Sequence, residues 1–195
     1  MAGSFGRRAG EKNVQRFSLL WPPIFRLDWD DITRAPLTPN LFSLLGVTPM
    51  IGRAFLPEEE TFGKHRVVLL SYELWQRRFG GDKSLIGQSL ILGAEAYTVI
   101  GVMPPRTMSP DGPRDLWIPL AFTPAEILER HSHNFSVYGR LKPGATLAQA
   151  RAEMDLIARR MAESDPQNRG WGAEVYPLHE IIVANSKRLL SRIAM

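Results

Sequence analysis

Apolar and polar residues in the middle of the chain predict a strand followed directly by a helix. Residues 66–71 (RVVLLS) are a continuous apolar run between polar residues, which is typical of a buried strand. Tyr72, Trp75 and Phe79 then recur at spacings of three and four, so they share one face of a helix. Ser71 suits the helix N-cap, and Gly80 can take the left-handed conformation that ends it.

Several further segments are rich in β-branched and aromatic residues and predict additional strands. They are QSLIL (88–92) and YTVIGVM (97–103), joined as a hairpin, then DLWIPLAF (115–122), NFSVYGRL (134–141) and WGAEVYPL (171–178). Pro119 suggests that the third of these is an edge strand or contains a bulge. IGRAF (51–55) is expected to be a short extended piece, and LPEEETFGKH (56–65) an exposed acidic loop.

Two more helices are predicted on either side of this β-rich stretch. The first begins at a cap on Thr38 and stops at Gly46. The second begins with Thr146 and Gln149, which have the spacing of a capping box. Its apolar stripe consists of Leu147, Ala150, Met154, Ile157 and Met161. Strands and helices therefore mix along one chain, and the predicted fold class is α+β.

The first 36 residues show no clear periodicity and predict no element. Their most apolar run, residues 17–25 (FSLLWPPIF), is far shorter than the roughly 20 residues that cross a bilayer, and Pro22 and Pro23 interrupt it. The same run could instead belong to a signal peptide, since basic residues precede it. This interpretation is weaker, because no small-residue cleavage site follows.

Composition narrows the class of function. Hydrophobic residues make up 44% of the 195, which is enough to form a core. The net charge is +4, but basic residues are scattered among acidic ones, and this argues against a nucleic-acid-binding protein. Cysteine is absent, which excludes disulfides, thiol catalysis and cysteine-ligated metals.

The stretch WQRRFGGDKS (75–84) resembles a phosphate loop or a nucleic-acid grip at first sight. A phosphate loop needs glycine immediately before its lysine, whereas Asp82 precedes Lys83, and the loop must follow a strand. Arg77 and Arg78 lie in the last turn of a helix, where positive charge is favourable. We therefore interpret this stretch as the end of a helix, with Trp75 and Phe79 in the core.

The remaining candidates for chemistry are isolated. His131 and His133 could begin a metal site on a strand, but no third ligand is nearby, so a polar loop is favoured. The carboxylates of Asp28, Asp30 and Asp31 are interpreted as a solvated segment, and Asn134 as a glycosylation tripeptide without significance. No nucleophile elbow or dinucleotide fingerprint is found. We predict no catalytic, cofactor-binding or metal-binding residue, no cofactor, and no enzymatic activity.

Four stretches of the chain, which follow one another in the same order as in a known family, resemble that family. They are residues 37–60 (LTPNLFSLLGVTPMIGRAFLPEEE), 67–104 (VVLLSYELWQRRFGGDKSLIGQSLILGAEAYTVIGVMP), 115–122 (DLWIPLAF) and 138–163 (YGRLKPGATLAQARAEMDLIARRMAE). Together they resemble the MacB-like periplasmic core domain of ABC transporter permeases, in particular the duplicated orphan permeases. The resemblance covers residues 37–183 and leaves 1–36 unmatched.

The resemblance implies a fold and a role. It implies a porter-like α/β part formed by the two ends (37–65 and 133–183), with a smaller β-rich lobe (66–132) inserted between them. Residues 184–195 would begin a truncated juxtamembrane segment. The implied role is that of a non-catalytic domain on the periplasmic face of the cell membrane, in transport or efflux, which couples ATP-driven motion to substrate handling or partner contact.

The implied partners are membrane helices, a cytosolic ATPase subunit and a periplasmic protein, with no nucleic acid. The chain would then be a fragment without its membrane helices. The alternative is a free-standing soluble binding module with the same fold. The transported substrate, the identity of the ATPase and the oligomeric state are not encoded in any pattern that we find.

Overall fold

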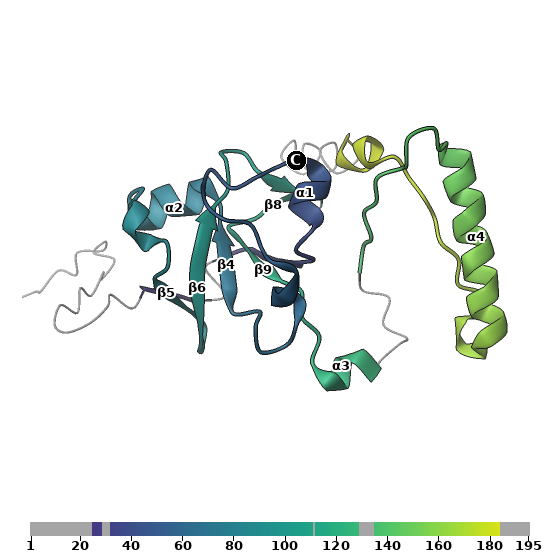
Figure 1. The fold of residues 1–195 in the computed structure, drawn as a ribbon, viewed down its shortest axis with the longest axis horizontal. Coiled ribbons are helices and arrows are strands. Elements are labelled where there is room, and N and C mark those ends of the chain that lie inside the picture. Colours follow the sequence, from purple (N-terminus) through teal and green to yellow (C-terminus); the bar gives the residue numbers. More distant parts are fainter. Residues whose placement is uncertain (1–24, 29–31, 111, 129–134, 184–195) are drawn as a thin grey trace, which may run out of the picture.

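A mixed arrangement of strands and helices forms the chain, which confirms the predicted α+β class. The computed structural model describes residues 25–28, 32–110, 112–128 and 135–183 (Figure 1). The strands are β1 (Phe25–Leu27), β2 (Arg34–Leu37), β3 (Ile51–Gly52), β4 (Val67–Leu70), β5 (Ser89–Leu92), β6 (Glu95–Val102), β7 (Met108–Ser109), β8 (Gly112–Pro113) and β9 (Leu116–Pro119). The α-helices are α1 (Leu41–Leu45), α2 (Tyr72–Phe79), α3 (Pro124–Leu128) and α4 (Leu147–Ser164), with 3₁₀ turns η2 (Pro57–Glu60), η3 (Lys83–Leu85) and η4 (Pro166–Asn168).

One seven-stranded sheet organises the described residues. Its order is β1-β5-β6-β4-β9-β2, and β3 pairs with β6 outside this path. β5 and β6 form the predicted antiparallel hairpin, whereas β4 pairs with β6 in parallel and with β9 in antiparallel orientation. Strand β4 therefore has a neighbour on both sides, and β7 and β8 form a separate two-stranded ribbon.

The sheet is apolar on both faces, and a different helix covers each face. Val68 and Leu70 of β4 point into a core with Leu74 and Trp75 of α2. Leu69, between them in sequence, points to the other face and joins a core that contains α1 and Trp117. This alternation is the expected consequence of the two-residue period of a strand.

The strand–helix unit that starts at residue 66 has the predicted form. The Ser71 hydroxyl accepts a hydrogen bond from the Leu74 backbone N–H at 3.0 Å, and Gly80 ends α2 in the left-handed conformation. Trp75 is only 4% exposed, and its indole Nε1 donates to the Asp82 carbonyl at 2.9 Å. That bond ties the helix to the turn that follows it.

Two strands begin within the first 36 residues, where the sequence predicted none. β1 pairs in parallel with β5, and β2 pairs in parallel with β9. The Phe25 ring packs edge-on against Phe79 of α2, with their centroids 5.3 Å apart. Both strands are short and find partners far along the chain, so no local periodicity could reveal them.

Two predicted strands are not strands in the structure. Residues 135–141 and 171–177 have no regular secondary structure, and residues 178–183 are helical. Residues 135–141 still contact the sheet domain, because Tyr138 packs against the α1 core and the Arg140 guanidinium donates to the Leu44 carbonyl. An alternating pattern needs an adjacent strand to become β structure, and the described residues supply none to these segments.

Two smaller predictions near α1 and η2 are also wrong. The N-cap of α1 is Asn40 rather than Thr38, whose hydroxyl bonds to the Asn40 side chain at 2.8 Å. Residues 57–60 are a 3₁₀ turn rather than an open loop, and Glu59 is buried. The predicted left-handed stop at Gly46 is confirmed.

Helix α4 forms as predicted, with both halves of the Thr146–Gln149 capping box in place. It stands at the opposite end of the molecule from α2 (Figure 1), and none of its side chains is buried. The two-part division into 37–65 with 133–183 and a lobe at 66–132 stays a prediction. Among the described residues, β2 and β3 share one sheet with β4, β5, β6 and β9.

Trp75→Ala is expected to lower the free energy of unfolding by about 3–5 kcal/mol, because it leaves a large cavity in the α2 core. Trp171→Ala is the matched control, because the Trp171 side chain is 57% exposed. Urea denaturation followed by circular dichroism measures both. Similar losses for the two variants would contradict the packing described here.

Gly52→Ala is expected to destabilise the protein by about 3 kcal/mol or more. A Cβ at Gly52 would collide with the Ile100 carbonyl oxygen and lie 2.8 Å from the Gly101 Cα. Gly46→Ala is the control, because Gly46 has a similar φ (75° against 79°) but nothing within 4 Å of its Cβ position. That variant should cost only about 1 kcal/mol, for backbone strain alone. If the two variants lost equal free energy of unfolding, the close approach of β3 to β6 would not be the cause of the loss at Gly52.

Candidate functional site

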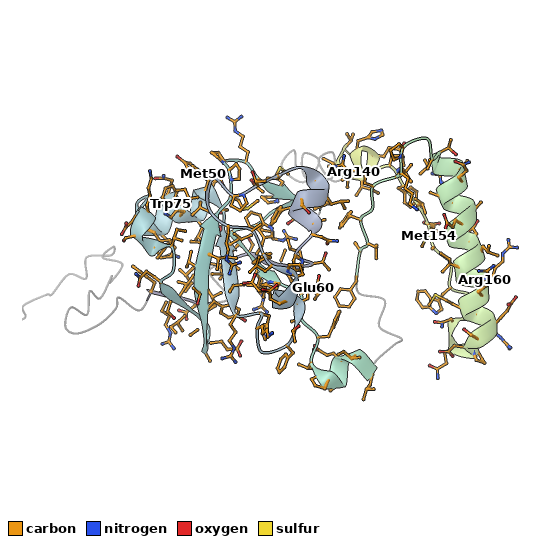
Figure 2. The ribbon with its side chains drawn as sticks, viewed as in Figure 1. Met50, Glu60, Trp75, Arg140, Met154 and Arg160 are labelled. Carbon is orange, nitrogen blue, oxygen red and sulfur yellow. The ribbon has the colours of Figure 1, made fainter. Side chains whose placement is uncertain are left out.

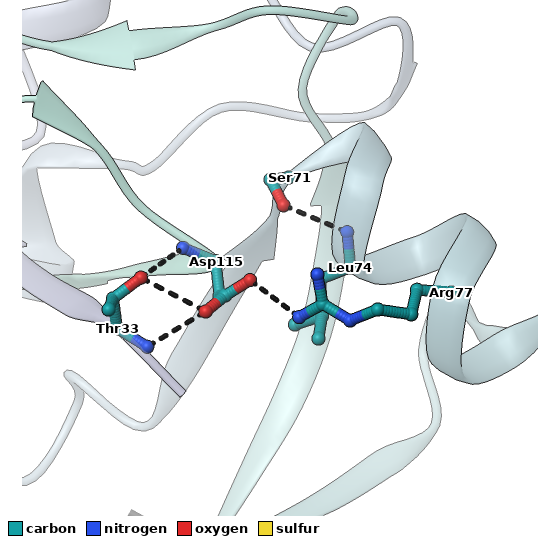
Figure 3. Close-up of polar contacts among 5 residues, drawn as sticks. All are labelled: Thr33, Ser71, Leu74, Arg77 and Asp115. Carbon is teal, nitrogen blue, oxygen red and sulfur yellow. Dashed lines mark hydrogen bonds and ion pairs between the residues drawn. The ribbon is translucent and has the colours of Figure 1, made fainter. Parts of the chain in front are cut away.

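The carboxylate of Asp115, just before β9, connects several segments of the described chain. One carboxylate oxygen, Oδ2, accepts from the Thr33 backbone N–H at 2.9 Å and from the Thr33 hydroxyl at 3.0 Å. The other, Oδ1, pairs with the Arg77 guanidinium at 2.8 Å (Figure 3). The backbone carbonyl of Asp115 accepts a hydrogen bond from the Ser71 backbone N–H at 2.8 Å. Asp115 thus connects the approach to β2, the end of β4 and the last turn of α2.

This arrangement favours the ionised carboxylate. Partial burial acts to raise the pKa of Asp115, but hydrogen bonds from Thr33 and the charge of Arg77 outweigh it and lower that pKa. An ionised carboxylate whose two oxygens are both engaged is poorly suited to proton transfer. We therefore assign Asp115 a structural role, that of holding three segments in register.

Arg77 has a more specific role than the sequence indicated. We expected it only to complement the helix dipole, whereas it makes an ion pair across 38 residues of sequence. Its guanidinium is about half exposed, so the pair itself contributes modestly. Arg78, its neighbour, also has an interaction partner.

The glycine pair ends helix α2, as predicted, and Lys83 begins the turn η3 that follows. Gly80 and Gly81 both have positive φ, and Asp82 caps the turn η3. The Ser84 backbone N–H and the Ser84 hydroxyl each bond to Asp82 at 2.8 Å, and these bonds lower the pKa of the carboxyl. Because the Asp82 oxygens are engaged within the turn and the loop follows a helix, the segment lacks the geometry of a phosphate loop.

Of the other sequence candidates, the structure describes only Asp28. Asp28 is exposed, whereas Asp30, Asp31, His131, His133 and Asn134 lie outside the described residues. Within residues 25–28, 32–110, 112–128 and 135–183, no three carboxylates or histidines come together in a way that could hold a metal ion.

An ion pair between a buried glutamate and a partly exposed arginine was missed by sequence reasoning. Glu59 is 5% exposed and receives two bonds from the Arg53 guanidinium, at 2.7 and 3.1 Å. The same carboxylate accepts from the Leu56 backbone N–H at 2.8 Å. The available signal was a glutamate three residues after Leu56, the spacing at which a side chain reaches back to the start of a helical turn. This pair fixes the loop after β3.

The surface that stands out chemically is apolar rather than charged. We call Leu147, Ala150, Met154, Ile157 and Met161 the α4 face. Three of its large residues, Met154, Ile157 and Met161, are exposed. Val137 and Phe135, in the extended segment before α4, are exposed as well. Exposed apolar side chains that share one face of a helix, as Met154, Ile157 and Met161 do, are typical of contact surfaces.

Because the pKa of Asp115 is lowered in the folded protein, its contribution to the free energy of unfolding should depend on pH. Its contribution to folding is present above the carboxyl's ordinary pKa of 3.8 and is lost as pH falls through the lower folded-state pKa. Asp115→Asn should therefore cost about 1 kcal/mol at pH 7 and progressively less below about pH 4. Asp28→Asn, at an exposed position, is the control. Urea denaturation across this pH range tests it, and a pH-independent loss would contradict it.

Comparison with known proteins assigns the domain. The sequence model of the MacB-like periplasmic core domain matches residues 24–157, which are 134 of the 195 residues. The match begins just before β1, thirteen residues ahead of where the sequence resemblance began. No curated protein matches this chain significantly.

Two solved structures are similar to the chain at low identity. The periplasmic region of MacB from Actinobacillus actinomycetemcomitans shares 15% identity over 67% of this chain, with a TM-score of 0.47. The extracellular domain of the noncanonic ABC-type transporter YknZ from Gram-positive bacteria shares 16% identity over 69%, with a TM-score of 0.45. The chain spans 56% and 65% of the length of these two structures. Because the family model matches most of its length, the chain belongs to the MacB-like periplasmic core domain family.

Proposed function

We propose that this chain acts as the periplasmic domain of an ABC-type permease and does no catalysis itself. The observation that carries the proposal is the family match over residues 24–157. In this role, membrane helices and a cytosolic ATPase subunit are its partners, and ATP-driven motion reaches the domain through the membrane part. None of the helices in the described part of the chain is long and apolar enough to span a bilayer.

The construction of the sheet domain supports a mechanical role. Strand β4 is buried on both faces, and α1 and α2 each cover one face. The Asp115 and Arg53–Glu59 clusters connect the loops to this core. Such a body moves as one unit when force is applied at one point, because close-packed cores resist deformation. This is the property that transmission of motion between partners requires.

The resemblance implied two roles for this domain, substrate handling and partner contact. The observations favour partner contact. The polar clusters described above are engaged within the fold, whereas α4 and residues 135–137 expose large apolar side chains, among them Met154, Ile157 and Val137. Apolar exposed surface gains free energy when another protein covers it. We therefore propose that the α4 end of the domain makes the contacts and that the sheet end holds the fold.

Accessibility of a single cysteine tests the location. The chain contains no cysteine, so Val137→Cys introduces a unique thiol at a position that is 93% exposed. In cells that express the gene with its chromosomal neighbours, a membrane-impermeant maleimide should label this thiol without lysis. Val68→Cys, fully buried in β4, is the control and should label only after denaturation. Labelling of Val137→Cys only after the cytoplasmic membrane is broken would place the domain inside the cell and refute the proposal.

A further inference from the structure

Methionine is the only sulfur-containing residue type of the chain, which has seven methionines and no cysteine. Oxidants that react with sulfur in this protein must therefore react with thioethers. Met103 has no exposed surface, because it lies in the α1 core, whereas Met50 and Met108 are 48% and 49% exposed. Met154 and Met161 are exposed to a similar degree, at 38% and 52%. Burial thus separates one protected thioether from four accessible ones among the described residues.

Position distinguishes Met154 and Met161 from the other accessible methionines. They are seven residues apart in one helix, which is about two turns, so both belong to the α4 face. Figure 2 shows Met154 on α4 and Met50 beside the sheet, well away from that helix. Ile157 is the third large side chain that the α4 face exposes. Two of these three exposed side chains are therefore thioethers.

We propose that Met154 and Met161 are sites of methionine oxidation, and that peroxide thereby changes the α4 face from an apolar surface to a polar one. In each reaction the thioether sulfur donates an electron pair to one oxygen of hydrogen peroxide, and the O–O bond breaks as the S–O bond forms. The other oxygen takes the proton of the transferred oxygen and leaves as water. The sulfur is oxidised to a sulfoxide, whose oxygen is a hydrogen-bond acceptor.

The α4 face offers no donor to the new sulfoxide oxygens. Backbone N–H groups in the interior of α4 are bonded within the helix, and the neighbouring members of the face, Ala150 and Ile157, are apolar. A surface that covers the face would have to bury the new acceptors without partners, which costs free energy. Oxidation therefore weakens a contact made on the α4 face. This consequence rests on the proposed function, which takes the α4 end as the contact surface.

Peptide mapping of the purified full chain after treatment with hydrogen peroxide tests the sites of modification. Trypsin cuts after Arg159 and Arg160, so Met154 and Met161 fall in separate peptides. Each of the two peptides should gain one oxygen atom in mass spectrometry. Met103 should react at least about tenfold more slowly, because a buried group reacts only when the fold opens locally. If the two α4 methionines react no faster than Met103, the proposal is overturned.

Fluorescence of the uncharged apolar dye Nile red tests the change in the face. Dye fluorescence with the wild-type protein should fall after peroxide treatment. The double variant Met154→Leu with Met161→Leu keeps an apolar face without thioethers, so its dye fluorescence should persist. The matched control is Met50→Leu with Met108→Leu, which removes two methionines of similar exposure outside the face and should respond like the wild type. Circular dichroism confirms that all three proteins are folded before treatment.

Two results of the dye experiment would overturn the proposal. One is an unchanged dye signal from the wild-type protein when both α4 methionines have become sulfoxides. The other is an equal fall in fluorescence for the α4 variant and for its control. Both experiments use the purified chain, so their failure would leave the thiol-labelling test of the proposed location unaffected. Failure of the labelling test would in turn leave the oxidation of the α4 face as measured.

Discussion

The structure depends on the burial of β4 on both faces and along both edges. Val68, Leu69 and Leu70 have no exposed surface, and the strand hydrogen-bonds to β6 on one side and β9 on the other. Successive side chains of β4 enter the two different cores, so α2 packs in the core of Val68 and Leu70, and α1 in the core of Leu69. A one-residue shift in the register of β4 would exchange the residues that face each helix.

The pairing of β4 with β6 also determines where glycine is needed. The register shifts between Val68 and Leu69, so that Leu69 lies opposite Gly101 rather than Ile100. A Cβ at Gly101 would lie 2.8 Å from the Ile51 carbonyl oxygen and 2.9 Å from a Leu69 methyl group. The absence of a side chain at Gly101 thus allows β3 to cross close to β6 while Leu69 fills the core from β4.

Local signals predicted the elements whose stabilising contacts are near in sequence. The apolar run before Ser71, the α2 face, the β5–β6 hairpin and the α4 capping box all depend on residues within a few positions of one another. The same signals explained WQRRFGGDKS as a helix end, because Trp75, Gly80 and Asp82 are each engaged within that segment.

Features that depend on distant residues were not predictable in this way. β1 and β2 contain only three and four residues and become strands because β5 and β9 are available to them. Asp115 gave no signal, because its partners Thr33 and Arg77 lie 82 and 38 positions away. The converse error arose at 134–141 and 171–178, where an alternating pattern without a neighbouring strand was interpreted as β structure.

Helix α4 combines these two situations in one element. Its start is specified locally, since the Thr146 hydroxyl and the Gln149 side chain satisfy the donors of the first turn. Its packing is not specified locally, since no residue of α4 is buried in the described chain. Anything that covers the α4 face will therefore bind the helical form and increase its stability by mass action. Folding of this end of the domain is for that reason coupled to any contact made on the α4 face, while the sheet around β4 folds on contacts of its own.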